Sequence, residues 1–127
     1  MKILLDTHIF LWYISGDKRL SIDKRDSIRD SNNEIYLSVV SIWEAIIKYQ
    51  LGKLPLPQPP ETYLPTQRQQ HQIMSLILTE ESVARLAQLP AIHRDPFDRM
   101  LICQANADGL SLMTDDPIMH QYPIQIL

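Results

Sequence analysis

Residues 2–14 read KILLDTHIFLWYI. The apolar run from Lys2 to Leu5 is rich in Ile and Leu, which favours a short buried strand. Asp6 ends this run, and Thr7 is expected to cap a helix over the apolar segment from Ile9 to Ile14. The stretch therefore predicts a strand, a turn and a helix, with a carboxylate directly after the strand.

Short apolar runs and helical patterns keep alternating along the rest of the chain. Further strands are expected at Ile35–Leu37, Leu110–Thr114 and Ile124–Leu127, and another apolar run covers Ile73–Leu78. Helices are expected over Ser21–Ser31, Ser38–Gln50, Glu61–Gln70, from Thr79 to a stop at Pro90 with Val83, Leu86 and Ala87 facing the core, and over Pro96–Ala107. This alternation indicates an α/β fold with a mainly parallel central sheet, in which ligands bind at the carboxyl ends of the strands.

The helix over Pro96–Ala107 has the clearest end signals. Asp95 precedes it as a cap, Pro96 stands at its first position, and Gly109 follows it as a stop. Four prolines between positions 55 and 60 form a connector that interrupts regular structure, yet the composition does not change across it. Residues 1–127 are therefore expected to form a single domain.

Scarce residue types exclude several classes of site. The chain has only three glycines, far apart, so neither a P-loop nor a dinucleotide-binding fingerprint can form. Cys103 is the lone cysteine, which excludes an internal disulfide and every paired-cysteine zinc site and favours a reducing, cytoplasmic setting. The longest apolar run, Ile9 to Ile14, is far too short to span a membrane.

The charge of the whole chain opposes binding to a polyanion. Twelve Lys and Arg against fifteen Asp and Glu leave a net charge of -3. Attraction to a nucleic acid would therefore have to be local, and bound divalent cations could reverse the sign of the charge at one site.

Acidic residues stand where the predicted strands end. Asp6 follows the first strand, Glu44 lies in the helix after the second, Asp98 lies in the first turn of the helix capped by Asp95, and Asp115 and Asp116 follow the strand Leu110–Thr114. Such carboxylates would repel one another without a cation, and hard oxygen ligands select Mg²⁺ or Mn²⁺ over zinc. The pattern predicts metal-assisted hydrolysis of a phosphodiester.

Four stretches of this sequence resemble PIN-domain ribonucleases, and among these the VapC-like toxins of bacterial toxin-antitoxin pairs. The resemblance covers essentially the whole chain in order, and its most specific piece is Asp-Pro-Phe-Asp-Arg. The stretches are Leu4-Leu5-Asp6-Thr7-His8, Ser41-Ile42-Trp43-Glu44, His93-Arg94-Asp95-Pro96-Phe97-Asp98-Arg99 and Thr114-Asp115-Asp116.

The resemblance implies a three-layer α/β/α sandwich and a magnesium-dependent endoribonuclease, in which Mn²⁺ could substitute for Mg²⁺. It assigns metal-binding and catalytic roles to Asp6, Glu44, Asp98 and Asp116, with Thr7 and Thr114 as supporting hydroxyls. It also implies an RNA substrate, a small antitoxin that covers the active-site groove, and a homodimer. Asp115 beside Asp116 departs from the usual pattern and leaves the choice between the two open.

Structural interpretations compete with several of these assignments. Ser41 and Glu44 fit a capping box, Glu44 and Lys48 fit an i,i+4 ion pair, and Asp95 fits a helix cap better than a ligand. Trp12, Trp43 and Phe97 are expected in the core. His8 and His93 are expected at structural positions or at the edge of the substrate site, whereas Arg94 and Arg99 are candidates to bind RNA phosphates.

Three alternatives to a toxin remain on the sequence. A PIN nuclease in RNA processing would use the same acids, and a binding module of this fold would cleave nothing. Phosphoryl transfer through an aspartyl nucleophile at Asp6 fits poorly, because His8 stands where a second acid is usual, and it would leave an acid-labile phosphoenzyme.

Overall fold

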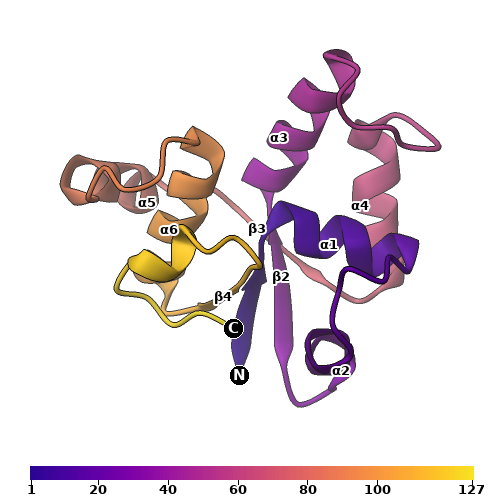
Figure 1. Cartoon of the computed structure of the whole chain (residues 1–127), viewed down its shortest axis with the longest axis horizontal. Helices are drawn as coiled ribbons and strands as arrows, with labels where there is room; N and C mark the ends of the chain where they lie inside the picture. Colours follow the sequence, from indigo (N-terminus) through magenta and orange to yellow (C-terminus); the bar gives the residue numbers. More distant parts are fainter.

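The computed structural model describes all residues from Met1 to Leu127 and contains one four-stranded sheet between two layers of helices (Figure 1). Its strands pair in the order β3-β2-β1-β4, and every pairing is parallel. The expected three-layer α/β/α sandwich is therefore confirmed. The elements are β1 (Lys2–Leu5), α1 (Thr7–Ser15), α2 (Ile22–Arg29), β2 (Glu34–Ser38), α3 (Val39–Gln50), α4 (Pro60–Gln70), β3 (Met74–Leu76), α5 (Glu80–Ala84), α6 (Pro96–Asp108) and β4 (Ser111–Met113), with 3₁₀ turns at Arg85–Gln88 and Met119–Gln121.

Alternation along β1 divides the core into two apolar clusters, one on each face of the sheet. Ile3 and Leu5 join the cluster that α1, α2 and α4 cover, and Leu4 joins the cluster that α6 covers. In Figure 1 these helices lie on opposite sides of the strands. Because successive side chains of a strand point to opposite faces, the apolar run Ile3–Leu5 of β1 requires helices on both sides.

The register of the sheet brings the ends of three strands to one edge. β1 is central, with Leu5 beside Leu37 of β2 and beside Met113 of β4. The chain leaves this edge at Asp6 after β1, enters α3 after β2, and reaches Thr114 after β4. Acidic groups that follow different strands can therefore meet at this edge.

The helix ends follow the expected local signals, except that a different residue caps α1. Asp95 caps α6 by accepting backbone hydrogen bonds, Gly109 ends that helix in the left-handed region, and Ser21 caps α2. At α1 the cap is Asp6 instead of Thr7, because the Asp6 carboxylate accepts the N–H of Thr7. The Thr7 hydroxyl is thereby left free for a longer-range contact.

Two predictions about the periphery are wrong. The segment Ile124–Leu127 runs beside β4 but forms only one isolated parallel bridge, between Leu112 and Ile126, and is too short to count as a strand. Of the residues expected to face the core after Thr79, Val83 is 44% exposed and Ala87 is also exposed, whereas Leu86 is half-buried. The polar Ser82 is buried instead. The short α5 packs on α6 through a different face from the one that its apolar residues suggest.

The aromatic residues also depart from expectation. Trp43 of α3 is 55% exposed, whereas Trp12 and Phe97 are half-buried. The rings of Trp43 and Phe97 meet edge to face with their centroids 4.8 Å apart. The expected burial of Trp43 is therefore wrong, because its side of α3 faces solvent and is covered only in part, by Phe97 of α6. None of the helices combines the length and apolar character needed to cross a membrane.

Candidate functional site

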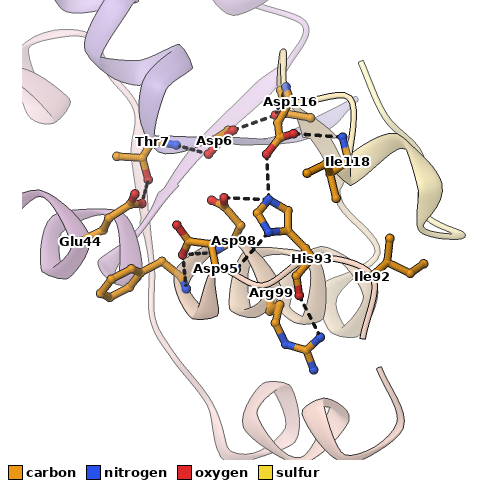
Figure 2. A network of polar contacts seen from close by, with 12 residues as sticks. Asp6, Thr7, Glu44, Ile92, His93, Asp95, Asp98, Arg99, Asp116 and Ile118 are labelled. Atoms are coloured by element: carbon orange, nitrogen blue, oxygen red, sulfur yellow. Dashed lines mark hydrogen bonds and ion pairs between the residues drawn. The ribbon is translucent and has the colours of Figure 1, made fainter. Parts of the chain in front are cut away.

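A polar pocket of about 360 Å³ opens at the edge of the sheet where β1 and β4 end. All four acids that the sequence singled out line it, and they come from four separate segments of the chain: Asp6 after β1, Glu44 from α3, Asp98 from α6 and Asp116 after β4. Figure 2 shows these side chains turned toward one another. The pocket also includes Asp95, Asp115, Arg19, Lys48, His8 and Trp12.

Both carboxylate oxygens of Asp6 are held by hydrogen bonds. The N–H of Thr7 donates to Oδ1 at 2.7 Å, and the Thr114 hydroxyl donates to Oδ2 at 2.7 Å. Burial raises the pKa of Asp6, and the hydrogen bond from Thr114 opposes that rise in part. Asp6 is therefore a rigid carboxylate in a place where its charge is poorly solvated.

Glu44 is buried on α3 and is held from two sides. The Thr7 hydroxyl lies 2.7 Å from its Oε1, and Lys48, one turn later on the same helix, forms an ion pair with its Oε2. Partial burial lowers the pKa of Lys48, but the hydrogen bond and charge of Glu44 outweigh it and leave that pKa raised. Ser38 caps α3, so the expected capping box between Ser41 and Glu44 does not form.

The carboxyl of Asp98, like that of Asp6, is shifted toward its neutral form by its surroundings. Burial, together with the charges of Asp6, Asp95, Glu44 and Asp116, raises the pKa of Asp98 to about 8. Without a cation, this carboxyl would hold a proton at neutral pH. The pocket therefore contains more carboxylates than its own cations can neutralise.

The two aspartates after β4 point in different directions. Asp115 forms an ion pair with Lys24 of α2. Asp116 accepts the N–H of Ile118 at 3.0 Å through Oδ1 and lies 2.8 Å from Nε2 of His93 through Oδ2. Asp116 therefore faces Asp98 and the centre of the acidic group, whereas Asp115 stands at its rim.

Three residues lie closer to the acids than their sequence patterns suggested. His93 lies between Asp98 and Asp116, although a position at the substrate edge was also expected for it. Lys48 and Arg19 are the Lys and Arg side chains that line the pocket. Arg19 pairs with Asp17 at 2.7 Å, and its guanidinium lies 5.0 Å from the ring centre of Trp12. The sequence indicated Lys48 through its spacing from Glu44, and His93 through the stretch that precedes Asp98, but it gave no signal for Arg19.

The two arginines expected to bind phosphate lie outside the lining of this pocket. Arg94 is exposed, and Arg99 donates through Nη1 to the carbonyls of Pro90 and His93, at 3.2 and 3.4 Å. Arg99 thereby braces the turn before α6. A role for either side chain in binding RNA stays a prediction.

Asp95 has the cap geometry that its position predicted. Its Oδ1 accepts the N–H of Phe97 at 2.9 Å and the N–H of Asp98 at 3.4 Å. Because Asn accepts such bonds almost as well, we expect Asp95→Asn to keep most of the stability and Asp95→Ala to lose about 1 kcal/mol. Urea unfolding in EDTA measures both. Equal losses in the two variants would contradict the cap, and a stable but inactive Asp95→Asn protein would move Asp95 into the catalytic group.

The donor atoms are suited to a hard cation. Ligand atoms of Glu44, Asp95 and Asp98 lie within 4.8 Å of one another, and so do those of His93, Asp98 and Asp116. The acids supply only oxygen, and both burial and the charges of the other carboxylates raise the pKa of Asp98. A divalent ion that prefers oxygen, such as Mg²⁺ or Mn²⁺, fits this set better than zinc does.

Solved structures share the fold along the whole chain. A chain in the crystal structure of VapBC2 from Rickettsia felis, bound to a promoter DNA fragment, superposes with a TM-score of 0.75 at 15% identity and covers 100% of this chain and 98% of its own. DNA-bound VapBC from Salmonella typhimurium gives 0.70 at 21% identity, with 100% and 97% covered. VapBC-1 from nontypeable Haemophilus influenzae gives 0.68 at 19%, with the same coverage.

Sequence comparison matches part of the chain to one named relative and nearly all of it to a family model. Ribonuclease VapC16 from Mycobacterium tuberculosis is 46% identical over 43 residues, which cover 34% of this chain and 30% of that protein. The match thus spans less than a third of that relative's length. The model of the family described as PIN domain matches residues 3–125, nearly the whole sequence. The chain therefore belongs to the PIN domain family.

Proposed function

We propose that this protein is a Mg²⁺-dependent endoribonuclease and the toxin of a toxin-antitoxin pair. The observation that carries the proposal is the convergence of Asp6, Glu44, Asp98 and Asp116 on one polar pocket, where burial and the neighbouring carboxylates raise the pKa of Asp98 to about 8. Binding of a cation would stabilise a site of this kind. Such a site is poorly suited to hold an apolar ligand.

The residues of the chain would hold the ion and orient the reactants. Asp6, Glu44, Asp98 and Asp116 are the proposed ligands, with Mn²⁺ able to replace Mg²⁺. When bound, one or two such ions would activate water and stabilise the leaving oxygen of a phosphodiester. Thr7 and Thr114 orient Glu44 and Asp6 through their hydroxyls, so two of the four carboxylates are held in place before any ion arrives.

RNA is the proposed substrate because the relative with 46% local identity is named a ribonuclease. The charge of the free pocket is unfavourable for a polyanion, so binding should depend on the ion together with local cations. Arg19 and Lys48 line the pocket and are the nearest candidates. Arg94 and Arg99 remain candidates farther along the surface.

A small antitoxin is the proposed protein partner. The structural neighbours are chains of VapBC complexes, and two of those complexes were solved with DNA. An antitoxin that covers the acidic pocket would have to bring positive charge to it, for the same reason that a cation would. We also propose a cytoplasmic location, where RNA is available and the free, buried Cys103 stays reduced, and a homodimer, which light scattering would test.

The defining experiment is cleavage of a set of fluorescent RNAs by the purified chain in Mg²⁺, with EDTA and a matched single-stranded DNA as controls. We expect endonucleolytic cleavage of at least one RNA in Mg²⁺, none in EDTA and none of the DNA. Cleavage undiminished by EDTA would contradict the metal site. Lack of cleavage in Mg²⁺ and Mn²⁺, together with tight RNA binding, would favour the catalytically silent module.

A second experiment separates a toxin from a nuclease of RNA processing. Induced expression in bacteria should stop growth, and an Asp98→Asn protein expressed at the same level should not. Normal growth with an active wild-type enzyme would favour a role in RNA processing. An acid-labile phosphoenzyme at Asp6 would instead indicate phosphoryl transfer.

A further inference from the structure

The turn before α6 fixes the imidazole of His93 between two acids from different elements. Nε2 lies 2.8 Å from Oδ2 of Asp116 and 3.1 Å from Oδ2 of Asp98 (Figure 2). Through these two contacts His93 links α6 to the loop after β4. The side chain of His93 is only 9% exposed, so solvent competes little for these contacts.

The backbone around His93 is held firmly. The Tyr122 hydroxyl accepts the N–H of His93 at 2.7 Å and that of Ile92 at 3.1 Å, and it donates to the carbonyl of Pro90 at 2.8 Å. Arg99 braces the same turn from α6, as described above. Tyr122 is itself buried, so the backbone at His93 is anchored to the core.

The other ring nitrogen determines where the proton of the imidazole lies. Nδ1 of His93 accepts the backbone N–H of Asp95 at 3.1 Å. A backbone N–H can only donate, so Nδ1 must present its lone pair, and the ring proton lies on Nε2. Nε2 therefore has no lone pair to offer to a metal ion or to a proton from water, and it can only donate.

We propose that His93 is a positioning residue: its Nε2–H holds the carboxylates of Asp116 and Asp98 in the arrangement that receives the cation. The inference rests on the proposed function and deepens it. In this assignment His93 is neither a metal ligand nor a general base, although its distances alone would allow it to join a ligand set with Asp98 and Asp116. Partners that orient metal ligands commonly contribute 10- to 100-fold in metal affinity.

Two substitutions separate the two nitrogens. His93→Asn keeps an acceptor near Nδ1 for the N–H of Asp95 but removes the distal donor, whereas His93→Gln places an amide N–H near Nε2. We expect His93→Asn to weaken Mn²⁺ binding by roughly 10-fold or more and His93→Gln to retain most of the affinity. Titration calorimetry gives the affinities, and melting in EDTA reports the fold. His120→Asn, at an exposed histidine outside the pocket, is the matched control and should bind as the wild type does.

A spectroscopic measurement tests the proton directly. Long-range ¹H–¹⁵N spectra of the metal-free wild type, with His93 assigned from the His93→Asn protein, should show the neutral Nε2–H tautomer. An Nδ1–H tautomer or an imidazolium would overturn the inference. So would unchanged Mn²⁺ affinity in His93→Asn, an equal loss in His93→Gln, or unfolding of both variants in EDTA. A wild-type chain that binds no Mn²⁺ would instead contradict the proposed function, and the inference would fall with it.

Discussion

An Asp98→Asn protein should cleave RNA at least about 100-fold more slowly than the wild type, with no loss of stability in the metal-free fold. Partners that only orient a ligand already contribute 10- to 100-fold, so the loss of a ligand itself should exceed that range. Asn keeps the shape and a hydrogen-bonding oxygen but has no charge to offer to a cation. Cleavage of a fluorescent RNA in Mn²⁺ measures the first effect, and thermal melting in EDTA measures the second.

The stability of the two proteins should diverge with pH, and the sign follows from the pKa of Asp98. That pKa rises from 3.8 to about 8 on folding. As the pH rises above 4, the unfolded carboxyl loses its proton while the folded one keeps it, so the free energy of unfolding of the wild type falls until about pH 8 and then levels off. The Asp98→Asn protein has no carboxyl at this position, so this fall in the free energy of unfolding does not occur. Its advantage in melting temperature in EDTA should therefore grow between pH 5 and pH 9.

Asp108→Asn is the matched control for this substitution. Asp108 lies at the exposed end of the same helix, outside the pocket. Its loss should leave cleavage intact and should not produce a difference in melting temperature that grows from pH 5 to pH 9. Full activity of Asp98→Asn would overturn the proposed site, and a stability difference that shrinks toward pH 9 would contradict the charge argument.

Mn²⁺ or Mg²⁺ should stabilise the wild-type fold strongly. At a 100-fold excess of free ion over the dissociation constant, binding to the folded state alone adds about 2.7 kcal/mol, which for a chain of this size raises the melting temperature by about 10 °C. Melting curves in EDTA and in increasing Mn²⁺, at constant ionic strength, measure the shift. Identical curves in EDTA and in saturating Mn²⁺ would count against any cation in this pocket.

The same measurement has a pH dependence with a defined direction. Below about pH 8 an incoming ion must displace the proton that Asp98 holds, so the apparent affinity should fall as the solution is acidified. The Asp98→Asn protein offers the ion one ligand fewer and has no proton at this position for the ion to displace. Both the rise in melting temperature caused by Mn²⁺ and its pH dependence should therefore be much smaller. A full Mn²⁺ shift in that variant would remove Asp98 from the proposed ligands.

Most of the fold could be predicted from the sequence because its signals are local. The apolar run before Asp6, the cap and proline that begin α6, and the glycine that ends it each act over a few residues. Alternation of such units leaves few topologies, and the parallel sheet is the simplest of them. The convergence of acids at strand ends follows from that topology, so the four candidate acids could be named before their positions were known.

Packing decided what the local patterns could not. Periodicity marks an apolar face but not whether another layer reaches it, so Trp43 and Val83 were expected in the core and are exposed. The proposal of Asp116 over Asp115 as a ligand depends on Lys24, which lies 91 residues before Asp115 and pairs with it. The proposed role of His93 depends on contacts with Tyr122 and with the loop after β4. The types of residue and their order along the chain determine the helices, the strands and the candidate acids. The side chains that orient those acids lie far apart in sequence and meet only when the helices pack on the sheet.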